Sequence, residues 1–132
     1  MRSKHSGDAV DWLNYARSDL ELARMNESSR VLLESLCFHA QQVAEKSLKA
    51  VLISCNIEFP RTHNLRTLLD IVPSDLAIPD EIEEGVILTD YAVASRYPGD
   101  FEPIEGEEYE DALYLAEIFL QWAEKVIREK TS

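Results

Sequence analysis

Residues 31–56 carry a long, sustained helical pattern, and it constrains the fold more than any other feature. Apolar side chains recur there with a helical period, at Leu33, Leu36, Cys37, Ala40, Val43, Ala44, Leu48, Val51, Leu52 and Cys55. That period places them along one side of a single helix, which other helices have to cover. Pro60 prevents the helix from continuing, because the residue before a proline is pushed out of the helical conformation. We therefore predict that this helix is the centre of a helical bundle.

Four further helices are expected, over about residues 8–26, 63–72, 79–97 and 105–130, and no segment has a convincing strand pattern. Thr62 or Asn64 can cap the short helix at 63–72, and Pro79 is a favoured first position of the next one. The last helix has acids at its start and bases at its end, as the helix dipole favours. The predicted fold is all-α, an up-and-down helical bundle of four long helices plus one short helix. The 132 residues fit a single domain, spanning residues 8–130.

Charge and cysteine usage narrow the function classes. The net charge of −12 opposes broad binding to nucleic acid, which depends on neutralising phosphates, although it leaves room for a local basic site.

No run of about 18 apolar residues exists, and the polar first residues do not resemble a secretory signal, so we expect a cytoplasmic protein without membrane contact. Cys37 and Cys55 would lie about 27 Å apart on one helix, too far for a disulfide. Since cysteines and histidines lack zinc-like spacing, we expect neither a metal nor another cofactor.

A polar stripe runs along the central helix. It consists of His39, Gln42, Lys46 and Lys49, at spacings of three, four and three residues. All four side chains can donate hydrogen bonds, and the two lysines can contact phosphate. One interpretation is a ligand-binding surface. The other is an ordinary solvated flank of a bundle helix, with Glu45 and Lys49 as an ion pair one turn apart, and spacing alone favours this second interpretation.

His63 is a second candidate for ligand binding, because it stands at the expected start of a helix. It belongs to the run Arg61-Thr62-His63-Asn64-Leu65. One hypothesis is that His63, Arg61 and exposed backbone N–H groups bind an anion there. The other is that His63 and Asn64 simply cap the helix, which is locally the favoured interpretation.

Arg96 is a third candidate, because of its acidic surroundings. Thirteen acidic residues lie between Asp75 and Asp111, and Arg96 is the single lysine or arginine in that stretch. It precedes Tyr97 and can join Asp90 and Tyr91 in a polar cluster. A structural ion pair and a ligand contact are equally consistent with this pattern.

Several short motifs follow one another along the chain in a recognisable order. They are Trp12-Leu13-x-x-Ala16-x-x-Asp19-Leu20-x-x-Ala23, the run Cys37-Phe38-His39-Ala40-Gln41-Gln42-Val43-Ala44-Glu45-Lys46-x-Leu48-Lys49-Ala50, then His63-Asn64-Leu65 and Arg96-Tyr97-Pro98. In this combination the chain resembles the HEPN domain family (higher eukaryotes and prokaryotes nucleotide-binding), in its small stand-alone prokaryotic form. The resemblance extends from about Asp8 to Lys130, and the run around Gln41 is its most specific part.

The resemblance implies a bundle of four to five helices that usually forms a homodimer. It also implies nucleotide binding and a minimal nucleotidyltransferase as partner, in two-component and toxin–antitoxin arrangements. Many members are metal-independent ribonucleases that use an Arg-(four to six residues)-His motif late in the domain. Here Arg61 and His63 are separated by one residue, Arg30 and His39 by eight, and no histidine follows Arg96, so the usual motif is missing.

We therefore expect a homodimeric module that binds a nucleotide or nucleic acid and acts with a minimal nucleotidyltransferase, in a toxin–antitoxin-like two-component system. Its candidate nucleotide contacts are His39, Gln42, Lys46, Lys49, His63, Arg96 and Tyr97. They would supply phosphate contacts and base-edge donors, with Tyr97 available for stacking. The alternative is a metal-independent ribonuclease with a non-standard site, using His39 or His63 with Arg96. No catalytic residue is assigned, because the sequence has neither a glycine-rich phosphate loop nor a Gly-x-Ser-x-Gly nucleophile motif.

Overall fold

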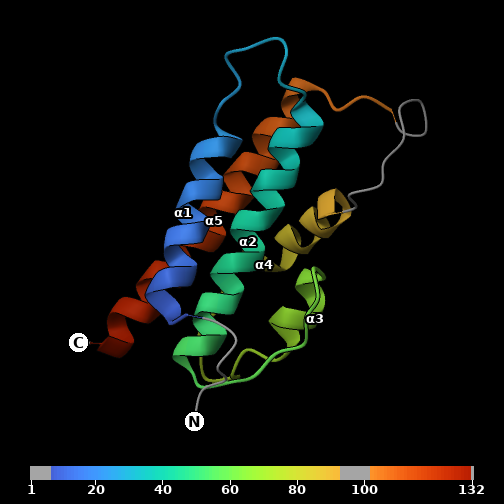
Figure 1. Cartoon of the computed structure of the whole chain (residues 1–132). Helices are drawn as coiled ribbons and strands as arrows, with labels where there is room; N and C mark the ends of the chain where they lie inside the picture. The colour runs from blue at the N-terminus through green and yellow to red at the C-terminus, as the bar shows by residue number, and fades with distance from the viewer. Residues whose placement is uncertain (1–6, 93–101, 132) are drawn as a thin grey trace.

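The computed structural model describes residues 7–92 and 102–131, and every regular element within these ranges is helical. The elements in chain order are α1 (Ala9–Ala23), α2 (Leu33–Ser54), α3 (Leu65–Asp70), α4 (Asp80–Glu84), the 3-10 helix η1 (Gly85–Ala92) and α5 (Gly106–Thr131). Their direction alternates from α1 to α2, to the pair α4–η1 and to α5 (Figure 1). The predicted all-α, up-and-down bundle is therefore confirmed.

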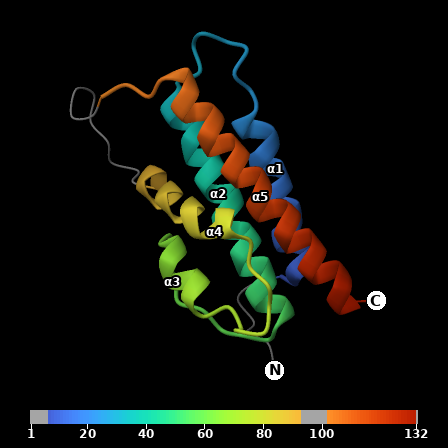
Figure 2. The ribbon, with the colours of Figure 1, turned by 180° about the vertical axis from the view of Figure 1, so that it is seen from behind.

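α2 lies at the centre of this bundle. It packs against α1 and α5, and α3 and η1 contact its remaining side. Seen from behind, α5 lies across both α1 and α2 (Figure 2). The predicted apolar stripe forms the core, in which Leu48 and Leu52 of α2 and Phe119 of α5 are all fully buried. Burial of each such side chain stabilises the fold by about 1.5–3 kcal/mol. Cys37 and Cys55 are not joined by a disulfide, as expected.

The end of α2 is set by a turn that the sequence reasoning attributed to Pro60. Asn56 has a φ angle of 59°, in the left-handed region that asparagine tolerates better than most residues. Its amide donates to the carbonyl of Ile53, and the Ile57 amide donates to the carbonyl of Leu52, each at 2.9 Å. These two bonds are those of a Schellman motif, which ends a helix. The turn brings residues 57–64 back beside α2, where they form one wall of the candidate site.

The fourth predicted helix is shorter and less regular than expected. It consists of α4, with five residues, and the 3-10 helix η1, with eight. η1 contains three β-branched residues with low helix preference, Val86, Ile87 and Thr89. Thr89 fixes it to the start of α3, because its Oγ1 accepts a hydrogen bond from the Leu65 amide at 3.0 Å. The predicted helix end near Tyr97 lies outside the described residues.

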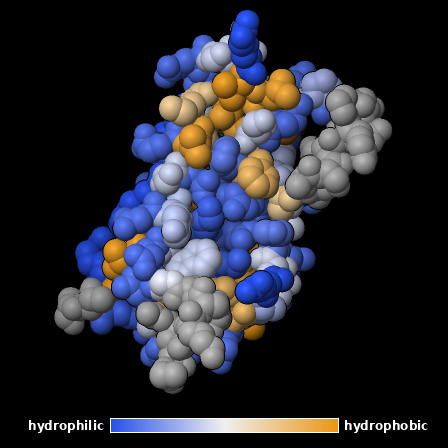
Figure 3. All heavy atoms as spheres, viewed as in Figure 1, coloured by the Kyte–Doolittle hydropathy of each residue, from blue (hydrophilic) through white to orange (hydrophobic). Residues whose placement is uncertain are grey.

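Exposed apolar side chains gather around the connection between α1 and α2 (Figure 3). Leu22, Met25, Val31 and Leu32 are between 39% and 60% exposed. Patches of this kind on a folded chain often mark contacts with other proteins. Among the described helices, none combines the length and the apolar character needed to cross a bilayer.

Candidate functional site

Glu45 is the centre of a buried polar network on the side of α2 that faces residues 57–64. Its side chain is only 5% exposed. One carboxylate oxygen accepts a hydrogen bond from Nζ of Lys49 at 2.8 Å, and the other lies 2.8 Å from Nδ1 of His63. Gln41 donates to that second oxygen at 3.1 Å. A buried charge needs such partners, because burial without them costs several kcal/mol, on the order of 3 to 5 when one partner is removed.

The charge of Glu45 determines which ring nitrogen of His63 carries a proton towards it. Burial raises the pKa of the Glu45 carboxyl, but the hydrogen bonds from Lys49 and His63 outweigh it, so this pKa lies below its ordinary value. The carboxylate is therefore ionised near neutral pH and can only accept hydrogen bonds. Nδ1 of His63 must then carry the proton, and Nε2 remains for a ligand.

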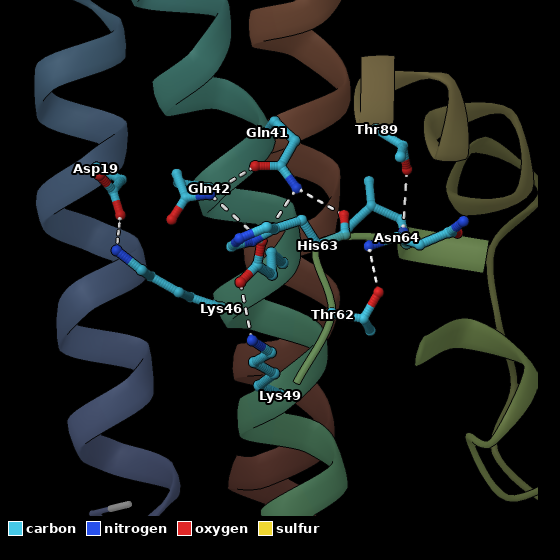
Figure 4. A network of polar contacts seen from close by, with 11 residues as sticks. Asp19, Gln41, Gln42, Lys46, Lys49, Thr62, His63, Asn64 and Thr89 are labelled. Carbon is cyan, nitrogen blue, oxygen red and sulfur yellow. Dashed lines mark hydrogen bonds and ion pairs between the residues drawn. The ribbon is translucent and has the colours of Figure 1, made fainter. Parts of the chain in front are cut away.

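Two glutamines, Gln41 and Gln42, complete the network, and both belong to the motif of residues 37–50 that carries the family resemblance. Nε2 of Gln41 also donates to the backbone carbonyl of His63 at 3.0 Å, and Gln42 donates to Oε1 of Gln41 at 2.7 Å. Gln41, Gln42, Lys49 and His63 gather on one side of α2, whereas Lys46 reaches across to Asp19 on α1 (Figure 4). The network thus holds His63 by both its ring and its backbone.

A pocket of about 550 Å³ opens beside this network. It is lined by Trp12, Lys49, Phe59, Arg61, Thr62 and His63. The rings of Trp12 and Phe59 meet edge to face with their centroids 6.4 Å apart, and Nζ of Lys49 lies 5.6 Å from each centroid. Arg61 is exposed and, among residues 7–92 and 102–131, has no ion pair or hydrogen bond from its side chain. The pocket therefore joins aromatic walls with cationic groups, at a size typical of small-molecule sites.

A second polar cluster lies between α1 and α2. Asp19, with a side chain 9% exposed, contacts Nδ1 of His39 at 3.0 Å and Nζ of Lys46 at 2.5 Å. Nζ of Lys46 also lies 5.8 Å from the ring centroid of Tyr15. His39 and Lys46 are therefore polar partners of a buried acid at a helix interface, and the ammonium group of Lys46 supplies its counter-charge.

The HEPN domain family matches residues 9–126, which is most of the chain. The chain belongs to the HEPN domain family. The family resemblance predicted from the motifs is thereby confirmed.

Two solved structures are similar to this HEPN chain. TT1696 from Thermus thermophilus is 31% identical, with a TM-score of 0.75 over 89% of this chain and 97% of that one. ST0689, described as an archaeal HEPN homologue, is 30% identical, with a TM-score of 0.56 over 96% of this chain and 97% of that one. No curated protein matches the sequence.

The four residues of the polar stripe predicted on α2 of this HEPN domain lie in two places: two belong to the network and pocket around Glu45, and two to the polar cluster around Asp19. Lys49 lines the pocket, and Gln42 supports the network behind it. His39 and Lys46 belong to the cluster on α1. The interpretation as a solvated flank is wrong, because Lys49 is only 8% exposed and the other three are half-buried. The ion pair predicted between Glu45 and Lys49 is confirmed.

The two residues predicted to cap the short helix, His63 and Asn64, have different roles. Asn64 caps α3, because its side chain accepts a hydrogen bond from the Thr67 amide at 3.2 Å. His63 takes no part in the cap and turns to Glu45 instead. The predicted role of Asn64 is therefore confirmed, while the proposed capping by His63 is wrong.

The predicted contacts Arg96 and Tyr97 lie outside the described residues. Of the cluster expected around them, Tyr91 donates a hydrogen bond to the carboxylate of Glu108 on α5. This contact ties the end of η1 to the start of α5.

The sequence analysis did not identify the aromatic walls, Trp12 and Phe59, or the buried acids, Asp19 and Glu45, as site residues. The pattern of α1 could have indicated Asp19, since it falls on the apolar face with Ala16 and Ala23, and an acid there requires a partner. No local pattern indicated Trp12 and Phe59, because they belong to distant segments of the chain. Only the fold brings them together.

Proposed function

We propose that this HEPN domain binds a nucleotide in the pocket beside Glu45. The observation that carries the proposal is the presence of Arg61 and the oriented ring of His63 in one cavity with Trp12 and Phe59. Aromatic side chains stack on nucleobases, and a guanidinium fork matches the oxygens of a phosphate. Membership of a family named for nucleotide binding supports the same conclusion.

The charge of the chain favours a small ligand over a nucleic-acid strand. The net charge of −12 produces a negative electrostatic field, which repels every phosphate of a nucleic-acid strand. A single nucleotide places its phosphate beside Arg61 alone and avoids most of this repulsion. We therefore expect binding of mononucleotides rather than of long RNA or DNA.

Calorimetric titration of the chain with AMP and ATP tests the proposal. Arg61→Gln is expected to weaken binding by about tenfold or more, because a hydrogen bond to a charged group contributes about 1.5–3 kcal/mol. Arg30→Gln is the matched control, since it removes another exposed arginine, in the α1–α2 connection and therefore at the opposite end of α2 from Arg61. Absence of binding at roughly millimolar nucleotide contradicts the proposal.

We also propose that the domain forms a homodimer through the exposed apolar side chains around the α1–α2 connection. The support is the exposure of Leu22, Met25, Val31 and Leu32, together with the dimeric habit of the family. Light scattering of the wild type should give the mass of two chains. Leu32→Lys should give the mass of one, whereas Ile87→Lys, at an equally exposed position on η1, should not. A monomeric wild type rejects this assembly.

Family membership further supports a partnership with a minimal nucleotidyltransferase, in a toxin–antitoxin-like two-component system. Co-expression with a nucleotidyltransferase encoded beside this gene tests it. The two chains should elute together from size-exclusion chromatography, and separate elution counts against the partnership.

A metal-independent ribonuclease is the second candidate function. The specific observation in its favour is that Glu45 orients the imidazole of His63 next to Arg61, as a general base is oriented beside a phosphate-binding group. RNA incubated with the chain in a chelator should then be cleaved. His63→Ala should abolish cleavage and His39→Ala should preserve it. An inactive wild type ends this candidate.

A further inference from the structure

We infer that the pocket recognises a phosphomonoester, the terminal phosphate of a mononucleotide, and discriminates against phosphodiesters. The inference rests on the proposed nucleotide binding and names the class of nucleotide. It follows from the charges, the donors and the surroundings of the pocket.

The charged groups of the pocket add up to a positive excess. Lys49 is offset by Glu45, whose carboxylate lies 2.8 Å from its ammonium nitrogen. The Arg61 guanidinium has no carboxylate partner within the part of the chain that the structure describes, and it adds one positive charge. A phosphomonoester carries about −1.5 to −2 charges near neutral pH, whereas a diester carries one, so the positive charge of Arg61 attracts the monoester more strongly.

The donors of the pocket also match three terminal oxygens better than two. Arg61 offers a planar fork of N–H groups, and Thr62 offers a hydroxyl. The outer ring nitrogen of His63, whose proton is on Nδ1, is an acceptor for the ionisable O–H that a phosphomonoester has and a diester lacks. Oγ1 of Thr62 already accepts a hydrogen bond from the Asn64 amide at 3.0 Å, which leaves its own proton to donate. A monoester presents three acceptor oxygens for these groups. A diester lacks one of them.

His63 is held ready for this contact before a ligand arrives. Its ring is fixed by Glu45 at 2.8 Å and its backbone carbonyl by Gln41 at 3.0 Å. The side chain is nevertheless 66% exposed, so its outer nitrogen is accessible. Ordering it in advance lowers the entropy cost of binding.

The surroundings of the pocket disfavour a continuing strand. Asp11 and Glu58 are exposed sequence neighbours of the two aromatic walls, Trp12 and Phe59. The additional phosphates of a strand would be repelled by carboxylates such as these and by the net charge of the whole chain. A ligand whose phosphate is terminal avoids this cost.

Titration calorimetry of the full chain with four related compounds tests the inference. They are AMP, adenosine, 3′,5′-cyclic AMP and the dinucleotide adenylyl-adenosine, which share the base and differ in the phosphate. We expect AMP to bind at least about tenfold more tightly than each of the others, a factor that corresponds to one charge-assisted hydrogen bond. His63→Gln and Arg61→Gln should reduce the affinity for AMP to that for cyclic AMP, and Arg30→Gln should leave the preference intact. Arg61 is exposed, and glutamine at position 63 keeps an N–H donor for the Glu45 carboxylate, so we expect both variants to fold, and circular dichroism verifies this.

The outcomes separate this inference from the proposed function. Equal affinities for AMP and either diester overturn the monoester preference while nucleotide binding stands. Adenosine binding as tightly as AMP also overturns it, because the pocket then recognises the base alone. If none of the four compounds binds, the proposed function itself fails and the inference falls with it.

Discussion

Nδ1 of His63 lies 2.8 Å from a carboxylate oxygen of Glu45, although 18 positions of the chain separate them. One residue belongs to a connecting segment and the other to the interior of α2. The contact therefore joins a titratable imidazole at the surface to a buried acid of the bundle. The same combination, a buried acid with one histidine and one lysine, recurs at Asp19 with His39 and Lys46.

Replacement of Glu45 by glutamine should destabilise the domain markedly. The variant leaves the ammonium group of Lys49 buried without its counter-charge, which costs about 3 kcal/mol. Urea unfolding followed by circular dichroism measures the loss. Glu58→Gln, at an exposed position, serves as the control and should change the free energy of unfolding by less than about 0.5 kcal/mol. Similar effects of the two variants would show that the network does not stabilise the fold.

The stabilisation by Glu45 should depend on pH in a specific direction. Because the pKa of its carboxyl is lowered in the folded state, from an ordinary value of 4.5, the ionised form is favoured by folding. Its contribution is therefore fully present above that ordinary value and is lost as the pH falls through the lower, folded pKa. The difference in unfolding free energy between wild type and Glu45→Gln should be large at about pH 7 and should shrink below about pH 4. A difference that grows on acidification would reverse the assigned sign.

Asp19→Asn should weaken the fold and leave the nucleotide pocket unaffected. Asp19 is buried against His39 and Lys46, so its loss leaves the ammonium group of Lys46 without a carboxylate and costs about 1–3 kcal/mol. Glu21→Gln on the same helix is the control, because its long contact with Arg24 is exposed and surface pairs contribute little. Thermal unfolding measures stability, and titration with AMP measures binding. Loss of binding in Asp19→Asn at a temperature where it is folded would place the second cluster in the site.

Gly85→Ala should destabilise the junction between α4 and η1. A Cβ at this position would lie 2.4 Å from a ring carbon of Phe119, which is buried and has little room to move. Overpacking of this kind costs about 1–3 kcal/mol. Gly106→Ala is the matched control, since a Cβ there meets no atom within 4 Å. Equal melting temperatures for the two variants would mean that Phe119 shifts freely.

The helices could be predicted from the sequence because their signals are local. α1 begins where Asp8 caps it, with its carboxylate accepting a hydrogen bond from the Asp11 amide at 3.0 Å. The apolar period likewise located α2 to within two residues at each end. The first helix ends three residues earlier than predicted and the short helix is two residues shorter at each end. The regularity of the fourth helix was also overestimated, since its β-branched residues have low helix preference.

The candidate site could be predicted only in part. His63 and Lys49 were named, but nothing local indicated that both bind the same carboxylate. That contact depends on the left-handed turn at Asn56, which directs residues 57–64 towards α2. Trp12 joins them through the packing of α1. Such convergence is a property of three-dimensional packing, and a period along the sequence carries no information about it.

The burial of Gln41 and Glu45, in the motif of residues 37–50, has a consequence for how the sequences of such domains diverge. Gln41 and Glu45 are buried, so most substitutions at these positions would destabilise the helical bundle. Arg61 and Thr62, by contrast, project from a connecting segment whose replacement leaves the scaffold standing. Related chains can thus inherit the same helix and acquire different ligand preferences by exchanging that segment alone.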